Sequence, residues 1–141
     1  MERRSVTCTK RLEWDAAHRV TQHGGKCANL HGHRWAAEIT VVGETGPEGM
    51  VLDFGVIKAT IGRWIDEKWD HAMLASDRDQ NIIQLCKDFD WKVYVFPFEP
   101  TAENLAECLR EVAARQIGEA SGLKVDSVRI CETPTSWATA T

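Results

Sequence analysis

Two long runs in which apolar and polar residues alternate constrain the fold of this chain more than any other feature. The first run extends from Ser5 to His18, and only Lys10 interrupts its apolar face. The second run begins at His31 and continues to Val42. Because successive side chains of a β-strand point to opposite faces, this period of two predicts two half-buried strands joined by a polar, glycine-rich loop.

Two further segments carry apolar residues at helical spacing. The first starts at Asp53, which is placed as an N-cap, and ends at about Trp69. The second opens at Thr101, just after Pro100, and presents one apolar stripe. Residues 72–90, which follow the first helix, are mixed and polar, and we expect a loop there with one short helical turn.

Two more strands complete the expected order. Residues 91–98, "WKVYVFPF", predict the third strand, and Lys124 to Glu132 predict the fourth, whereas the tail that follows is expected to be irregular. A chain of 141 residues fits a single domain, residues 1–141. The order ββαβαβ predicts an α+β domain in which a four-stranded antiparallel sheet carries both helices on one face. The other face has apolar residues of its own, so we expect an oligomer.

Charge and cysteine content argue against several classes of protein. The net charge of −4 argues against a nucleic-acid binder, which normally carries a basic field. The charged start is not followed by an apolar run, and no stretch approaches the length of a membrane span, so we expect neither a secretory leader nor a membrane protein. The five cysteines are scattered without a C-x-x-C pair, which favours a reduced, cytoplasmic protein.

Three histidines fall where the two long strands are expected to meet. His31 and His33 leave the same strand face as Trp35, and His18 ends the neighbouring strand on its own apolar parity. Each of these imidazoles alone is most simply a hydrogen-bonded core residue, but three of them converging at one sheet end favour Zn²⁺ with an open fourth position. His23, beside two glycines, is expected to be solvated.

Cys27 lies in the loop between the two long strands, and the residues alone leave two interpretations of it open. It is the fourth ligand, beside the three histidines, in a structural zinc site, or it is a reactive thiol beside a catalytic zinc. Its loop position next to Lys26 and two glycines favours the thiol, because nearby positive charge stabilises a thiolate.

Five motifs occur in order along nearly the whole chain: AAHR, C-x-x-x-H-G-H, DH, PTAENLA and ETPTSWA. Together they resemble the 6-pyruvoyltetrahydropterin synthase family, and most closely its bacterial 6-carboxytetrahydropterin synthase branch, which works in queuosine biosynthesis. The resemblance implies the tunnelling fold, a four-stranded antiparallel sheet with two helices on one side. It also implies a homo-oligomer, a hexamer built as a dimer of trimers.

The resemblance implies the metal site and its neighbour. The three histidines named above become Zn²⁺ ligands, and Cys27 becomes the base that takes a proton from the substrate. The implied substrate is 7,8-dihydroneopterin triphosphate, and the implied products are 6-carboxy-5,6,7,8-tetrahydropterin, acetaldehyde and triphosphate. Three residues separate Cys27 from His31, which favours this carboxy branch over the 6-pyruvoyltetrahydropterin synthase alternative. The alternative of another class is a non-catalytic oligomeric module whose structural zinc site consists of one cysteine and three histidines.

The resemblance also assigns functional roles to five residues, each of which has an equally simple structural explanation. Asp70 and His71 become a dyad for a second proton transfer, where a charged helix end is the alternative. Glu132 becomes the group that grips the pterin and joins the proton relay, where a solvated strand-end acid is the alternative. Thr101 and Glu103 help to hold the pterin, where helix capping is the alternative.

Three basic residues are candidates for binding the triphosphate group, although exposed basic side chains are more often merely solvated. They are Arg19, Lys26 and Arg34.

Overall fold

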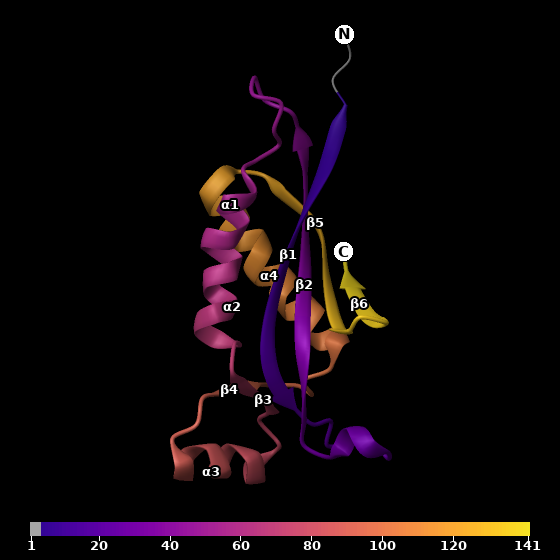
Figure 1. Ribbon diagram of the computed structural model, residues 1–141, viewed down its shortest axis with the longest axis vertical. Helices are drawn as coiled ribbons and strands as arrows, with labels where there is room; N and C mark the ends of the chain where they lie inside the picture. The colour runs from indigo at the N-terminus through magenta and orange to yellow at the C-terminus, as the bar shows by residue number, and fades with distance from the viewer. Residues whose placement is uncertain (1–3) are drawn as a thin grey trace.

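The computed structural model describes residues 4–141, which form a twisted sheet with helices packed along it (Figure 1). The strands are β1 (Ser5–His18), β2 (His31–Glu44), β3 (Ala72–Ser76), β4 (Val93–Phe96), β5 (Lys124–Thr133) and β6 (Ser136–Ala140). They lie in the order β4-β3-β1-β2-β5-β6 in one six-stranded sheet. β1 and β2 have 14 residues each and form the long axis of the molecule.

The sheet is mixed, because its two halves pair differently. β1, β2, β5 and β6 pair antiparallel in that order, whereas β3 runs parallel to β1 and β4 runs parallel to β3. The parallel pairing with β3 is short and involves only Ala16, Ala17 and His18 at the end of β1. The small parallel half therefore sits beside the strand end that carries His18.

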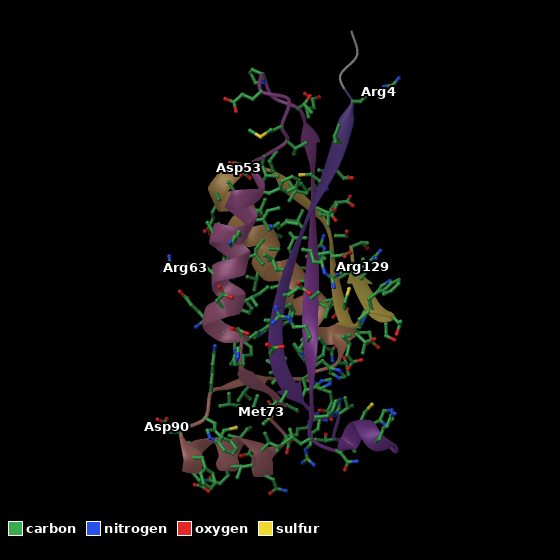
Figure 2. The ribbon with its side chains drawn as sticks, viewed as in Figure 1. Arg4, Asp53, Arg63, Met73, Asp90 and Arg129 are labelled. Carbon is green, nitrogen blue, oxygen red and sulfur yellow. The ribbon has the colours of Figure 1, made fainter. Side chains whose placement is uncertain are left out.

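The helices are α1 (Phe54–Ile57), α2 (Arg63–Lys68), α3 (Gln80–Phe89) and α4 (Ala102–Ser121). A π-helical turn, Lys58–Gly62, joins α1 to α2, so that one continuous helix runs along the sheet (Figure 1). Asp53 caps it as predicted, since its side chain accepts a hydrogen bond from the Gly55 amide at 2.7 Å (Figure 2). α4 also lies beside the long strands, and α3 lies at the end of the molecule where β1 stops and β2 begins.

The expected four-stranded antiparallel sheet with two helices is wrong, because the sheet has six strands in mixed pairing and α3 is an additional helix. Residues 72–90, expected as a loop with one short helical turn, contain β3 and the longer helix α3, and the tail expected to be irregular forms β6. β3 is buried on both faces and so lacks the period of two. β6 carries mostly small and hydroxyl side chains, which give a weak apolar alternation.

The core lies between the long strands and the helices, and tryptophans dominate its centre. Trp14 of β1 stacks on Trp35 of β2 at a centroid distance of 6.3 Å and contacts Trp69 at 5.7 Å. All three side chains are fully buried. Since Trp14 and Trp35 belong to the predicted apolar faces of the two long strands, the face assignment made from the alternation is confirmed.

Among residues 4–141, no helix combines the length and the apolar character that crossing a lipid bilayer requires.

The tryptophan core predicts that replacing a buried aromatic side chain lowers the free energy of unfolding much more than replacing an exposed one. We expect Trp14→Ala to lower the free energy of unfolding by about 3–5 kcal/mol, because the cavity left by the ring cannot close. Trp137, with 53% of its surface exposed, provides the matched control, and Trp137→Ala is expected to cost at most about 1 kcal/mol. Urea unfolding followed by circular dichroism measures both values, and equal losses would contradict this description of the core.

Candidate metal centre and active site

The pairing of β1 with β2 brings the three predicted histidines together. His18 lies directly opposite His31, and His33 lies opposite Ala16. The three ring centroids are 4.7 Å (His18–His31), 4.8 Å (His31–His33) and 5.2 Å (His18–His33) apart. The convergence of imidazoles predicted from strand parity is therefore present in the structure.

Main-chain carbonyl groups orient two of these rings. Nδ1 of His18 lies 2.7 Å from the carbonyl oxygen of Pro100, and Nδ1 of His31 lies 2.7 Å from that of Asn29. A carbonyl oxygen only accepts hydrogen bonds, so each Nδ1 carries the proton and donates it. Each Nε2 is left with a free lone pair, which is the arrangement found in metal-binding histidines.

Within the described residues, the Nε2 atoms of His18 and His33 are buried and have no hydrogen-bond partner. A buried polar atom without a partner costs about 1–3 kcal/mol. Burial also lowers the pKa of both imidazoles, although the Glu132 carboxylate opposes that shift, so they favour the neutral form that binds metals. These residues therefore fit a divalent cation, and three imidazole nitrogens suit zinc among other transition metals.

Glu132, which the resemblance assigns to the pterin, is the fourth member of this cluster. Its Oε1 lies 3.1 Å from Nε2 of His18 and 3.4 Å from Nε2 of His33. One ligand atom from each of the three histidines and from Glu132 lies within 4.8 Å of the others. The sequence carried one signal for this position, since Glu132 continues the apolar stripe of β5.

Cys27 lies in a 3₁₀ turn, Lys26–Ala28, and its side chain is half-buried. Its carbonyl oxygen accepts a hydrogen bond from the Val20 amide at 2.8 Å, which ties the loop back to the end of β1. Among residues 4–141, two groups of His, Cys, Asp and Glu are close enough to hold an ion, and Cys27 belongs to neither. The loop thus holds a thiol that stands apart from the histidine cluster.

Asp70 and His71 form the contact that a dyad requires. Nδ1 of His71 lies 3.0 Å from Oδ1 of Asp70, although neighbours on a regular helix do not face each other. The contact arises because α2 ends at Lys68 and His71 adopts a left-handed conformation with φ of 58°. Such a conformation costs a non-glycine residue about 1–3 kcal/mol and is concentrated at functional sites.

The backbone of β1 holds this dyad in place. The Asp15 amide donates to Oδ1 of Asp70 at 3.2 Å, and the His71 amide donates to the carbonyl oxygen of Asp15 at 2.7 Å. The ammonium of Lys92 donates to the carbonyl oxygen of Asp70 at 2.6 Å. Burial alone would raise the pKa of Asp70, but the hydrogen bonds from Asp15 and His71 lower it, so its carboxylate stays ionised beside the imidazole.

One open cavity of about 640 Å³ lies beside the dyad, and Asp15, His33 and His71 are among the residues that line it. Met73 and Asp90, which Figure 2 labels at this end of the molecule, are also part of its wall. Trp91, which is 53% exposed, adds an aromatic ring to the wall. The cavity is large enough for a small organic substrate.

The other predicted residues lie at the start of α4. Thr101 is its N-cap, and its hydroxyl accepts a hydrogen bond from the Asn104 amide at 3.2 Å, as the capping alternative expected. Glu103 is exposed in the first helical turn. Pro100, immediately before Thr101, contacts His18, so this helix start adjoins the histidine cluster.

Two of the basic triphosphate candidates have acidic partners. Nε and Nη2 of Arg19 each lie 2.7 Å from an oxygen of the Asp79 carboxylate, which is 4% exposed and also caps α3. Arg34 pairs with Asp15 at 3.0 Å, whereas Lys26 is exposed. The strong pair between Arg19 and Asp79 anchors α3 to the end of β1.

Two residues that sequence reasoning missed hold the loop and the turn around this site. Glu99 accepts hydrogen bonds from the Thr21 hydroxyl and from the Gln22 amide, which fastens the loop after β1 to the segment before α4. The Lys92 ammonium donates to the carbonyl oxygen of Asp66 in α2 at 3.1 Å as well as to that of Asp70. Both are charged residues beside strand ends, and nothing in their spacing signals these contacts.

His23, which was expected to be solvated, is exposed, and its Nδ1 accepts a hydrogen bond from the Gly25 amide at 2.8 Å within the same loop.

The sheet, the histidine cluster and the dyad define a tunnelling-fold protein with a candidate metal site. Residues 7–141 match the family described as "6-pyruvoyl tetrahydropterin synthase", and the chain belongs to this family. The resemblance inferred from the five motifs is thereby confirmed.

The curated relatives carry the name of one branch. The 6-carboxy-5,6,7,8-tetrahydropterin synthase of Rickettsia bellii (strain RML369-C) is 39% identical over 131 residues, which are 92% of this chain and 95% of the relative. The Haemophilus influenzae protein of the same name is 31% identical over 136 residues, covering 92% of this chain and 94% of the relative.

Solved structures support the same fold. The 6-pyruvoyl tetrahydropterin synthase of Caenorhabditis elegans has a TM-score of 0.73 at 26% identity and covers 100% of this chain and 99% of its own. The uncharacterized protein WS1659 from Wolinella succinogenes has a TM-score of 0.84 at 24% identity, with 96% and 97% covered. The second likeness concerns the fold alone.

The Arg19–Asp79 pair predicts a stability difference that depends on pH. The Arg19 guanidinium lowers the pKa of Asp79, so the ionised carboxylate stabilises the folded protein at neutral pH, and this contribution is lost as the pH falls through that lowered pKa. We expect Asp79→Asn to lower the free energy of unfolding by about 1–3 kcal/mol at pH 7 and by less at about pH 3, where the carboxylate of the unfolded chain is already largely protonated. Urea unfolding of the chelator-treated protein at both pH values measures the difference.

The exposed neighbour Asp77 provides the control for this experiment. Asp77→Asn is expected to leave the free energy of unfolding nearly unchanged at either pH. A loss for Asp79→Asn that is equally large at pH 3 would show that the charge is not what stabilises the end of β1.

Proposed function

We propose that this protein is a Zn²⁺-dependent lyase that converts 7,8-dihydroneopterin triphosphate and water to 6-carboxy-5,6,7,8-tetrahydropterin, acetaldehyde and triphosphate, in queuosine and related deazapurine biosynthesis. The observation that carries the proposal is the convergence of His18, His31 and His33 on one cluster at the end of the same strand whose backbone holds the Asp70–His71 dyad. The relatives named 6-carboxy-5,6,7,8-tetrahydropterin synthase support the carboxy branch, as does the three-residue spacing between Cys27 and His31.

His18, His31 and His33 would hold the zinc ion, and the unpartnered Nε2 atoms of His18 and His33 support this role. When bound, zinc supplies Lewis-acid chemistry that makes C–H bonds next to a coordinated hydroxyl more acidic. The carbonyl groups of Pro100 and Asn29 fix two of the rings in the metal-binding tautomer, so the site is preorganised.

Cys27, as a thiolate, takes a proton from the substrate side chain. Its position in a loop that is hydrogen-bonded to the end of β1 holds the thiol outside the group of possible metal ligands. A thiol that remains outside the ligand set stays available for proton transfer.

His71 carries out the second proton transfer from its exposed position on the cavity wall. The ionised carboxylate of Asp70 orients the imidazole and stabilises its protonated form after a proton has been taken up. Because the Asp15 backbone fixes both residues, the dyad keeps its geometry while protons move.

The pterin ring is held by Glu132, which accepts hydrogen bonds from the ring N–H and the exocyclic amine. Thr101 and Glu103 assist from the start of α4. The active protein is a homohexamer, a dimer of trimers, as in the family implied by the motifs.

The product identifies the branch. We expect the purified, zinc-loaded protein to convert 7,8-dihydroneopterin triphosphate to 6-carboxy-5,6,7,8-tetrahydropterin with release of one acetaldehyde per turnover, as seen by mass spectrometry and by an aldehyde trap. A product that keeps its three-carbon side chain would instead identify a 6-pyruvoyltetrahydropterin synthase.

Replacing the Cys27 thiol distinguishes between an enzyme and a structural zinc module. We expect Cys27→Ala to keep its zinc content and its melting temperature, because the sulfur is not a ligand, and to lose at least about 100-fold in turnover, because a positioned proton acceptor contributes about 10²–10⁴-fold. Metal analysis, thermal unfolding and a turnover assay on the same preparation measure the three quantities.

Cys8, half-buried within β1, is the matched control, and Cys8→Ala is expected to retain turnover. Loss of zinc and of stability together in Cys27→Ala would favour the structural module with its cysteine ligand and would contradict the proposed function.

A further inference from the structure

The loop that carries Cys27 has few supports from the rest of the chain. It spans residues 19–30 and lies at the end of the molecule where β1 stops and β2 begins (Figure 1). Arg19 fixes the start of this loop through its ion pair with the N-cap of α3, and Nδ1 of His31 binds a carbonyl oxygen near the end of the loop. Between these two points, Glu99 is the one residue outside the loop, within the described part of the chain, whose side chain forms hydrogen bonds with it.

The loop folds back on itself next to Glu99. The Thr21 hydroxyl and the Gln22 amide both donate to Oε1 of Glu99, the amide at 3.2 Å. The amide of the preceding residue, Val20, donates to the carbonyl oxygen of Cys27 at 2.8 Å. Because these three donors are consecutive in the chain, a movement of the two that bind Glu99 also moves the residue to which Cys27 is bonded.

Packing contributes little to the placement of this loop. None of residues 19–30 is buried, and Leu30, which has the largest aliphatic side chain among them, is 48% exposed. Gly24 and Gly25 add backbone freedom in the middle of the loop. A segment with so few apolar contacts opens easily, so the hydrogen bonds with Glu99 decide where the thiol lies.

Glu99 itself stands on a rigid support. Its carbonyl oxygen accepts hydrogen bonds from the Thr101 amide and from Nδ2 of Asn104, both at 2.9 Å. The next residue, Pro100, is buried, and its own carbonyl group orients His18. A residue before a proline is restricted to extended conformations, which limits the freedom of Glu99 further. One short segment thus orients a histidine of the cluster and also binds the loop that carries the thiol.

We infer that Glu99 is a positioning residue that holds the loop against the segment before α4 and thereby fixes the position of the Cys27 thiol. The placement of the thiol concerns the protein without substrate, whereas its effect on turnover rests on the proposed function. Glu99 acts through the loop and needs no contact with the substrate. Because its backbone is fixed at the start of α4, the thiol is held by the same support as the ring of His18.

Alkylation of the zinc-loaded protein with iodoacetamide, followed by mass spectrometry of the cysteine peptides, tests the placement without any turnover. Glu99→Ala removes both hydrogen bonds to the loop, so we expect the half-buried Cys27 to react about tenfold faster. Cys8, half-buried in β1, is the internal reference, and its rate is expected to stay unchanged. Glu99→Gln keeps an oxygen that accepts the same hydrogen bonds, so it should retain the wild-type rate at Cys27.

Glu107, an exposed acid of α4, provides the matched control, and Glu107→Ala is expected to leave the alkylation rate of Cys27 unchanged. If the rate at Cys8 rose in proportion to that at Cys27 in Glu99→Ala, Glu99 would merely stabilise the whole fold. If the rate at Cys27 stayed at the wild-type value, the loop would be held without Glu99. Either result would overturn the inference.

Thr21→Val provides a second variant, which removes one donor to Glu99 and leaves the Gln22 amide in place. We expect the alkylation rate of Cys27 to rise about threefold, less than in Glu99→Ala. The double variant should react no faster than Glu99→Ala alone, because both substitutions break the same contact. Effects that multiply in the double variant would contradict the inference, and if Glu99→Ala did not fold, an unchanged rate in Thr21→Val would overturn it.

Turnover of 7,8-dihydroneopterin triphosphate tests the consequence for the reaction. In Glu99→Ala we expect kcat to fall about tenfold or more while KM and zinc content stay near the wild-type values, because a displaced base slows proton transfer without disturbing the metal or the pterin contacts. Glu99→Gln should restore kcat. Alkylation needs no product, so a wild type that makes no carboxypterin, together with the expected alkylation rates, would contradict the proposed function and leave the positioning role of Glu99 intact.

Discussion

The antiparallel register between β1 and β2 is the constraint on which the rest of the structure depends. It places His18 opposite His31 and the stacked Trp14 opposite Trp35, so the same pairing builds both the cluster and the centre of the core. A slip of one residue would turn the histidines and the tryptophans of one strand to the other face together. The burial of the tryptophan pair therefore fixes the geometry of the imidazoles at the strand ends.

β1 also links the two chemical groups of the candidate site. Its last residue contributes an imidazole to the cluster, and three residues earlier the backbone of Asp15 holds Asp70 and His71. A strand fixed along fourteen paired positions is a rigid support, so the distance between the dyad and the cluster is set by the sheet and not by loops. Rigid support of this kind is what positioned proton transfer requires.

The sequence allowed the long strands, the helix caps and the histidine convergence to be predicted, because each follows from a local period or a local cap. β3 and β6 could not be predicted, since β3 is buried on both faces and β6 has few apolar residues. The position of Glu132 beside His18 depends on the twist and irregular pairing of strands far apart in the chain, which no spacing reveals. The contact within the dyad required a left-handed residue at His71, a conformation that the letters alone do not indicate.

The hydrogen bonds that set the proton positions on His18 and His31 end on main-chain oxygens of Pro100 and Asn29. Every amino acid has a backbone carbonyl, so replacing either acceptor residue leaves the acceptor chemically unchanged as long as the chain path is kept. The orientation of these rings therefore does not depend on which side chains stand at the two supporting positions. Related sequences can therefore differ at many positions around such a centre while the Nε2 atoms of these two histidines keep their orientation towards the cluster.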